Sequence, residues 1–121
     1  MITKNLHKLT LDNTDFRRVL ITNSHSQLVL MCINPGEEIG EEEHDLDQIL
    51  YFVAGSGKAV FEGREEEFAA GDVANVPATT KHNFINTGDS PLKLFTIYSP
   101  PEHENATVHK TKAEADEAEH H

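Results

Sequence analysis

Residues 36–55 read GEEIGEEEHDLDQILYFVAG, an acidic segment bounded by glycines that runs into an apolar stretch. Within it, Glu42, His44 and Gln48 are separated by even numbers of positions. Side chains two or four positions apart in an extended chain point to the same side, so three potential metal ligands would converge on one face of a sheet if no bulge changes the phase between them. A fourth candidate, His82, lies in residues 71–86, GDVANVPATTKHNFIN. We predict that these two stretches fold together around a metal ion.

Length and charge limit the classes of protein to consider. The 121 residues suit one domain with a modest core, and Cys32 is the only cysteine, so no internal disulfide can form. The formal charge of −11 disfavours phosphate backbones and anionic lipids, so we expect neither nucleic acid nor membrane as a partner. No signal-like apolar region follows a basic start, and no apolar run approaches the length of a membrane span. We therefore expect a soluble, cytoplasmic protein.

Short apolar segments alternate with turns rich in Gly, Pro and Asn along most of the chain. The sheet is expected to begin within residues 16–21, and the run 28–33 is typical of a strand covered on both faces. The remaining expected strands are 48–54, 58–61, 65–68, 73–76, 82–86 and 92–99. Regular short strands without a long helical pattern predict an all-β sandwich or barrel.

The last twenty residues differ in character from the rest. We expect a barrel domain over residues 1–101 and a polar C-terminal tail over 102–121. Thr111 followed by Glu114 fits a capping box that opens a short helix through Glu119, which needs a docking surface to be stable. The pair His120–His121 also fits the remnant of a purification tag, and it is kept out of any metal argument.

The spacing of the two ligand-bearing stretches resembles the paired motifs of the cupin superfamily, the small RmlC-like jelly-roll barrels. The first motif, glycine, two histidines, glutamate and glycine, falls on Gly36, Glu42, His44, Gln48 and Gly55. The second, glycine, proline, glycine, histidine and asparagine, falls on Gly71, Pro77, Thr79, His82 and Asn86. Three positions depart from the family pattern, namely Glu42 for a histidine, Gln48 for the glutamate and Thr79 for a glycine.

The resemblance implies a double-stranded β-helix fold and metal ligands at Glu42, His44, Gln48 and His82. Two imidazoles and one carboxylate form a facial set that suits a divalent transition metal with open coordination positions. The sequence does not choose among Fe, Mn, Zn, Ni and Cu. The neutral carbonyl of Gln48 would leave the site with one negative charge less than a glutamate, so the metal would be more electrophilic. A single side chain of any of these types is more often exposed to solvent, or hydrogen-bonded within the protein, than bound to a metal. Only the joint spacing of the four favours a metal site.

The interior of such a barrel is the default small-molecule pocket. By strand parity, Leu50 and Phe52 would face inward with Gln48, and Phe84 and Asn86 with His82. These residues would surround a small organic molecule that carries an oxygen donor. The opposite faces of the same sheet are also apolar, at Tyr51, Val53, Phe95 and Ile97. Apolar residues on both faces predict a covering layer, and a homodimer is the expected source.

Three functions remain open from the sequence. The first is a metal-dependent enzyme on a small organic molecule, either dioxygenase-like or isomerase-like. The isomerase idea comes from the resemblance alone, because no phosphate clamp is visible, and no Ser-His-Asp or Cys-His set suggests covalent catalysis. The second is a non-catalytic module that binds a metal or small ligand, as a sensor or carrier, and the third is a purely structural dimer. The substrate, the metal and whether Gln48 coordinates it are left open.

Overall fold

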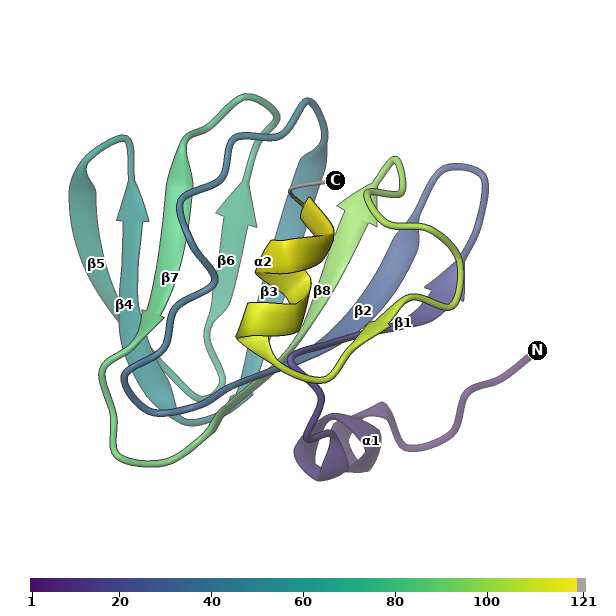
Figure 1. Cartoon of the computed structure of the whole chain (residues 1–121), viewed down its shortest axis with the longest axis horizontal. Helices are drawn as coiled ribbons and strands as arrows, with labels where there is room; N and C mark the ends of the chain where they lie inside the picture. The colour runs from purple at the N-terminus through teal and green to yellow at the C-terminus, as the bar shows by residue number, and fades with distance from the viewer. Residues whose placement is uncertain (120–121) are drawn as a thin grey trace.

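Two antiparallel sheets enclose the core in a computed structural model that describes residues 1–119 (Figure 1). The larger sheet has six strands, in the order β6 (Val73–Val76), β3 (Asp47–Ala54), β8 (Leu92–Ser99), β2 (Gln27–Ile33), β1 (Arg17–Thr22) and β9 (Val108–His109). The smaller sheet has three, in the order β5 (Arg64–Ala69), β4 (Ser56–Phe61) and β7 (His82–Asn86). This arrangement confirms the expected all-β jelly-roll barrel, and each expected strand is present within one or two residues of its expected bounds.

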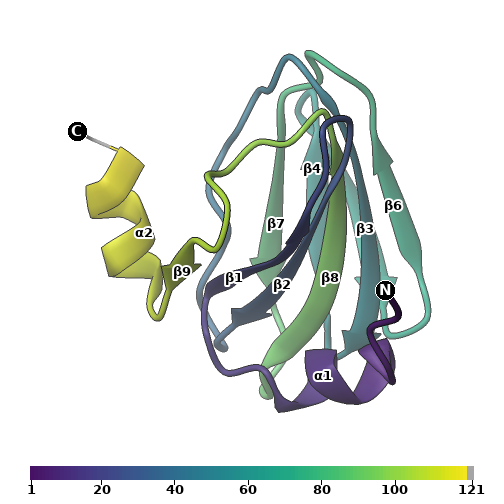
Figure 2. The same ribbon diagram turned by 90° about the vertical axis from the view of Figure 1, so that its right-hand side faces the viewer.

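A short N-terminal helix, α1 (Leu6–Asp12), was not predicted. Its first turn is capped by Asn5, whose side-chain oxygen accepts a hydrogen bond from the Lys8 backbone N–H at 3.1 Å. Lys8 and Asp12, four positions apart, form an ion pair at 2.6 Å on its exposed side. The helix lies at one end of the barrel against β3 and β8 (Figure 2), and the side chain of Thr10 is fully buried there. Packing against the sheet stabilises a helix that is too short to persist alone.

Aromatic side chains from β3, β4, β5 and β7 pack together in the barrel interior. Phe52 and Phe68 stack with ring centroids 3.9 Å apart, and the ring of Phe84 lies 5.8 to 6.2 Å from those of Phe52, Phe61 and Phe68. Edge-on and offset contacts of this kind contribute beyond the burial of apolar area alone. Phe84 is also two residues from His82 on β7, so the core fixes the strand that carries one candidate ligand.

Buried and exposed side chains alternate along most of β3, as the sequence-based assignment of its inward and outward faces requires. Gln48, Leu50 and Phe52 are buried, whereas Ile49 and Tyr51 on the opposite face are exposed. The alternation ends after Phe52, where a register shift against β8 leaves the next residue buried as well. The outer face therefore keeps a patch of exposed apolar side chains, made of Ile49, Tyr51, Val73 and Ile97. The homodimer that would cover this patch stays a prediction.

The C-terminal segment docks on its own barrel. Strand β9 pairs with β1, and helix α2 (Lys112–Glu119) begins where the Thr111 hydroxyl accepts the Glu114 backbone N–H at 3.1 Å, which confirms the expected cap. Ala115 of α2 is only 1 % exposed and belongs to the core cluster. Figure 2 shows β9 and α2 beside the barrel. His120 and His121 lie outside the described residues.

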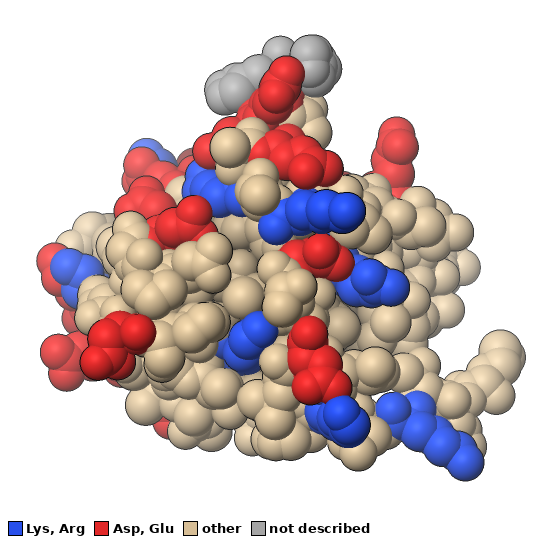
Figure 3. Space-filling model, turned by 60° about the horizontal axis from the view of Figure 1, so that its bottom comes forward, with Lys and Arg blue, Asp and Glu red and all other residues tan. Residues whose placement is uncertain are grey.

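Charged side chains of both signs share the face drawn in Figure 3. Asp and Glu gather around α2 at the top and along the left-hand edge, and Lys and Arg are interspersed among them. Within residues 1–119, no helix has the length and apolar character that crossing a bilayer requires. The prediction that neither nucleic acid nor membrane is a partner is untested by these observations.

Candidate metal centre

The acidic loop between β2 and β3 lies along β7 and brings Glu42 opposite His82. The Glu42 backbone N–H donates to the His82 carbonyl at 2.8 Å, and the His82 N–H donates back to the Glu42 carbonyl at 2.9 Å. Residues that exchange both backbone hydrogen bonds across an antiparallel pair project their side chains to the same face. A second bridge, between Glu38 and Ile85, holds the earlier part of the loop on the same strand. Backbone pairing thus places residues that are forty positions apart in the sequence side by side.

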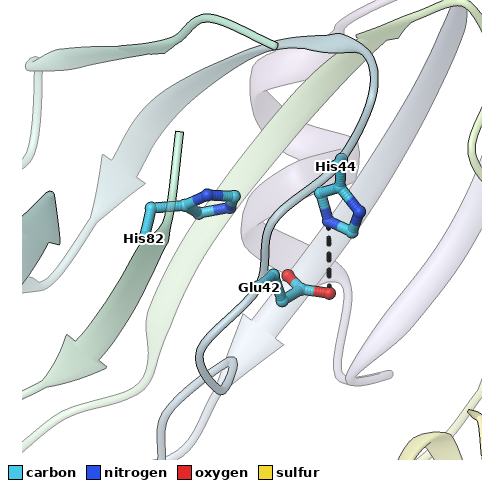
Figure 4. Close-up of side chains that lie close together, drawn as sticks. All are labelled: Glu42, His44 and His82. Carbon is cyan, nitrogen blue, oxygen red and sulfur yellow. Dashed lines mark ion pairs between the residues drawn. The ribbon is translucent and has the colours of Figure 1, made fainter. Parts of the chain in front are cut away.

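Three candidate ligands gather at this bridge (Figure 4). One donor atom each from Glu42, His44 and His82 lie within 4.8 Å of one another. His44 Nε2 is 3.3 Å from Glu42 Oε2, and the two imidazole rings have centroids 5.7 Å apart. Glu42 and His44 come from the loop and His82 from β7, with the His82 ring directed toward the other two (Figure 4). The sequence-based prediction that these three side chains converge is thus matched by their positions.

His82 is held as a metal ligand would be. The residue is 2 % exposed, and Nδ1 lies 2.8 Å from the Thr80 carbonyl oxygen, which can only accept, so Nδ1 carries the proton. The lone pair is then on Nε2, and this buried atom has no hydrogen-bond partner among residues 1–119. A buried acceptor left unsatisfied is costly, and a second hydrogen bond that fixes the tautomer is typical of metal-binding histidines. The residues present therefore fit a metal ion.

Gln48, the fourth candidate ligand, lies on β3, which pairs with β8 in the larger sheet. It is buried, and its amide nitrogen donates to the Thr96 hydroxyl at 3.0 Å. This bond fixes the amide orientation, and the carbonyl oxygen Oε1 is a second buried acceptor without a hydrogen-bond partner in the described part of the chain. Coordination of a metal by this oxygen stays a prediction.

The four expected pocket residues all lie in the barrel interior. Leu50, Phe52 and Phe84 are fully buried members of the core cluster. Asn86 uses its amide to hold the chain, since Nδ2 donates to the carbonyls of Ile33 at 2.8 Å and Ser90 at 2.9 Å. These four residues thus pack in the barrel interior. Their contact with a ligand stays a prediction.

Tyr98 is a neighbour of the site that the sequence analysis did not single out. Its ring stands edge-on to His44, with centroids 6.4 Å apart, and it is 2 % exposed. Burial raises the pKa of Tyr98, and the carboxylate of Glu42 adds to the effect, so the hydroxyl remains protonated and can donate. The alternation along β8, with Phe95 and Ile97 facing out, was the signal that could have identified Tyr98 as an inward residue.

Two residues of the C-terminal segment also reach the site. Glu102 Oε1 lies 3.6 Å from His44 Nδ1, and the His103 ring stands edge-on to Tyr98 with centroids 5.3 Å apart. Both residues line a surface hollow of about 380 Å³, together with Arg17 and His109. Glu102 and His103 follow Pro100–Pro101 and share no periodicity with the strands, so no sequence pattern indicated them.

Thr79 has a backbone conformation that normally requires glycine. Its φ is 68°, in the left-handed region, which is uncommon for a β-branched residue. Its N–H donates to the His44 carbonyl at 2.6 Å, so this strained turn ties the loop before β7 to the loop that carries Glu42 and His44. Strain of this kind costs about 1–3 kcal/mol and is commonly retained where it positions functional residues.

Acidification is expected to destabilise the protein through His103. Burial, followed by the charges of Arg17, His109 and His44, lowers the pKa of His103 to about 3 from the ordinary histidine value of 6.5. Between these two values the unfolded chain binds a proton that the folded chain does not, so the free energy of unfolding falls as the pH drops below 6.5. We expect His103 to account for up to about 2 kcal/mol of the loss between pH 7 and pH 5.

Urea unfolding of the wild type and of His103→Gln at both pH values measures this contribution. The variant should show the shallower pH dependence, while His7→Gln, a change on the exposed side of α1, should leave it as in the wild type. An equal slope in the wild type and His103→Gln would contradict the expectation.

Comparisons with known proteins agree with the fold. The family described as Cupin domain matches residues 29–98, more than half of the chain. The uncharacterized protein YrkC of Bacillus subtilis (strain 168) is 42 % identical over 95 % of this chain, which spans 66 % of YrkC, just under two thirds. The crystal structure of BH2720 from Bacillus halodurans is 42 % identical, with a TM-score of 0.93 over 96 % of this chain and 93 % of that one.

A more distant similarity concerns an enzyme. The 5-nitrosalicylic acid 1,2-dioxygenase of Bradyrhizobium sp. is 29 % identical over 66 residues, which are 54 % of this chain and 32 % of the dioxygenase. The family match covers both ligand-bearing stretches and most strands of the barrel. The chain therefore belongs to the cupin family.

Proposed function

We propose that this cupin binds a divalent transition metal through Glu42, His44 and His82, with Gln48 as a fourth donor, and acts as a metal-dependent enzyme on a small organic molecule. The observation that carries the proposal is the buried Nε2 of His82, which lacks a hydrogen-bond partner among the described residues and faces a carboxylate and a second imidazole. A divalent ion would satisfy all three donors at once and offset their buried charge.

The protein's own groups define what such a site can do. A bound ion supplies Lewis acidity and open coordination positions for an oxygen donor of the substrate. Glu42, His44 and His82 occupy one side of the site, and the backbone pair between residues 42 and 82 keeps them in place. Tyr98, protonated and buried beside His44, would be a hydrogen-bond donor to a ligand at the ion.

Of the two reaction types, we favour the dioxygenase-like one. Two histidines and one carboxylate are the ligand set associated with non-haem Fe(II) oxygenases. The similarity to the 5-nitrosalicylic acid dioxygenase gives this reading support from a protein of stated activity. The isomerase-like alternative rests on the family resemblance alone.

A non-catalytic binding module is the second candidate. The interior below the cluster is packed with core side chains, among them Leu50, Phe52 and Phe84, which are fully buried. A barrel interior filled by its own side chains suits a protein that binds the ion itself or a very small ligand, as a sensor or carrier. Metal retained without turnover would favour this candidate.

Elemental analysis tests the proposal directly. A chain lacking His120 and His121 should retain about one equivalent of transition metal after incubation with Fe(II), Mn(II), Zn(II), Ni(II) or Cu(II) and extensive dialysis. Oxygen uptake by the Fe(II)-loaded protein on addition of small phenolic acids would support the dioxygenase-like reading. Absence of bound metal after all five incubations would refute the metal centre.

A homodimer and a cytoplasmic location complete the proposal. The support for a dimer is the exposed apolar patch on the outer face of the larger sheet, where Ile49 is 45 % exposed and Val73 64 %. Patches of this kind, rimmed by polar residues, are typical of protein interfaces. The acidic composition supports a protein that works away from nucleic acids and anionic membranes.

A further inference from the structure

His44 presents its two ring nitrogens to two different carboxylates. Nε2 lies 3.3 Å from Glu42 Oε2, on the side of the ligand cluster. Nδ1 lies 3.6 Å from Glu102 Oε1, on the side of the C-terminal segment. The carboxylate side chain of Glu102 is 31 % exposed, so it is partly withdrawn from solvent at this contact. One nitrogen is thus available to a metal while the other faces a negative charge.

A buried glutamine anchors the backbone that carries Glu102. Gln27 of β2 is 1 % exposed, and its Oε1 accepts the backbone N–H groups of Glu102 at 3.2 Å and His103 at 3.0 Å. Its Nε2 donates to the His103 carbonyl at 2.7 Å and to the Thr22 hydroxyl at 3.0 Å. A buried amide whose oxygen and nitrogen are both hydrogen-bonded fixes the segment against β2.

A series of aromatic ring contacts joins the same C-terminal segment to His44, the proposed metal ligand. The ring of His103 stands edge-on to Tyr98, and Tyr98 in turn stands edge-on to His44. Further along, β9 pairs with β1, and Ala115 of α2 is buried in the core. Two sets of contacts therefore fix the position of Glu102. Gln27 holds its backbone, and the docked strand β9 and helix α2 hold the chain that follows it.

We propose that Glu102 is a positioning residue of the metal centre, which orients His44 by accepting a hydrogen bond from its Nδ1–H. The inference rests on the metal site proposed above. The present separation of 3.6 Å is an ion-pair distance, and a shift of about 0.7 Å in the Glu102 side chain would bring it within hydrogen-bond range. Bonding at Nδ1 selects the tautomer that leaves the Nε2 lone pair for the metal and makes that nitrogen a stronger donor.

The charge of Glu102 also suits the composition of the ligand set. Gln48 contributes no negative charge, so Glu42 is the only carboxylate among the proposed ligands. A second carboxylate on the far side of His44 adds negative charge near the ion without occupying a coordination position. The C-terminal segment, which contributes little apolar area, would in this way contribute to metal affinity.

Metal titration of matched variants tests the inference. Co(II) serves as the probe, and its affinity is measured by competition with a chromophoric chelator at constant pH. We expect Glu102→Gln to bind Co(II) about 10–100-fold more weakly than the wild type, the range found when partners of ligating histidines are removed. The control Glu104→Gln removes the same charge from an exposed position two residues away and should bind within about twofold of the wild type.

Two further measurements separate positioning from folding. Urea unfolding of the metal-free proteins should give the same free energy for the wild type and Glu102→Gln within about 0.5 kcal/mol. The Nδ1 proton of His44, followed by nitrogen-15 NMR, should shift in Glu102→Gln and stay unchanged in Glu104→Gln. Wild-type affinity in Glu102→Gln would overturn the positioning role and leave the metal centre intact, whereas a wild type that binds no Co(II) would overturn the metal centre itself.

Discussion

Replacement of His82 by alanine is expected to weaken metal binding by more than about 100-fold, beyond the loss caused by removing a residue that only orients a ligand. His82 is the most buried of the three clustered donors, and its ring is held by the bond from Nδ1 to the Thr80 carbonyl. Its loss removes one of the two imidazoles and leaves a single imidazole, the Glu42 carboxylate and the weaker neutral carbonyl of Gln48. Elemental analysis after loading and dialysis measures the effect.

His7→Ala is the matched control for this experiment. His7 lies on the exposed side of α1, so its removal takes away an imidazole without touching the cluster. Both variants must first be shown to unfold cooperatively, since His82 is buried next to Phe84. Stoichiometric metal in a folded His82→Ala protein would show that the ion binds elsewhere.

Gly57→Ala is expected to destabilise the fold by about 3 kcal/mol or more, although it adds only one methyl group. A β-carbon at this position would overlap the Ile85 carbonyl oxygen and lie 2.6 Å from Cζ of Phe68. Gly57 lies between β5 and β7 in the smaller sheet, and backbone atoms of a paired strand cannot move aside without loss of ladder hydrogen bonds. Displacement of Phe68 would also disturb its stacking on Phe52.

Gly88→Ala provides the control, because both substitutions reduce the freedom of the unfolded chain equally. At Gly88 the closest atom to an added β-carbon is the Ser56 hydroxyl oxygen at 3.1 Å, which can rotate away. We expect this variant to stay within about 1 kcal/mol of the wild type in urea unfolding. A similar stability of Gly57→Ala and Gly88→Ala would show that the smaller sheet yields more readily than its packing indicates.

Local patterns in the sequence were sufficient for most strands, whereas the convergence of three candidate ligands was predicted from the joint spacing of two separate stretches and their resemblance to the cupin motifs. Along β3 the two-residue alternation correctly separated Gln48, Leu50 and Phe52 from the outward residues. Glu42 and His44 do point to the same site, but not because they lie on one extended strand, as the sequence analysis assumed. Both precede β3 in an irregular loop, and it is the backbone bridge to His82 that brings them to the site.

The features that sequence reasoning missed depend on docking. Helix α1 is capped by Asn5, but seven residues give too weak a periodic signal to identify, and its stability comes from the sheet beneath it. The same holds for Glu102 and His103. Their place at the site is set by the buried amide of Gln27, some 75 positions away in the sequence, and a single amide carries no pattern that a local reading could detect.

The burial of Tyr98 between two histidine rings has a spectroscopic consequence. The chain contains no tryptophan and only two tyrosines, Tyr51 on the outer face of the sheet and Tyr98 at the site. Its ultraviolet emission therefore comes from two phenols in contrasting surroundings, and one of them lies within 6.4 Å of the His44 ring. We therefore expect the emission of Tyr98 to change when a metal binds at the site, so that binding could be followed without any added label.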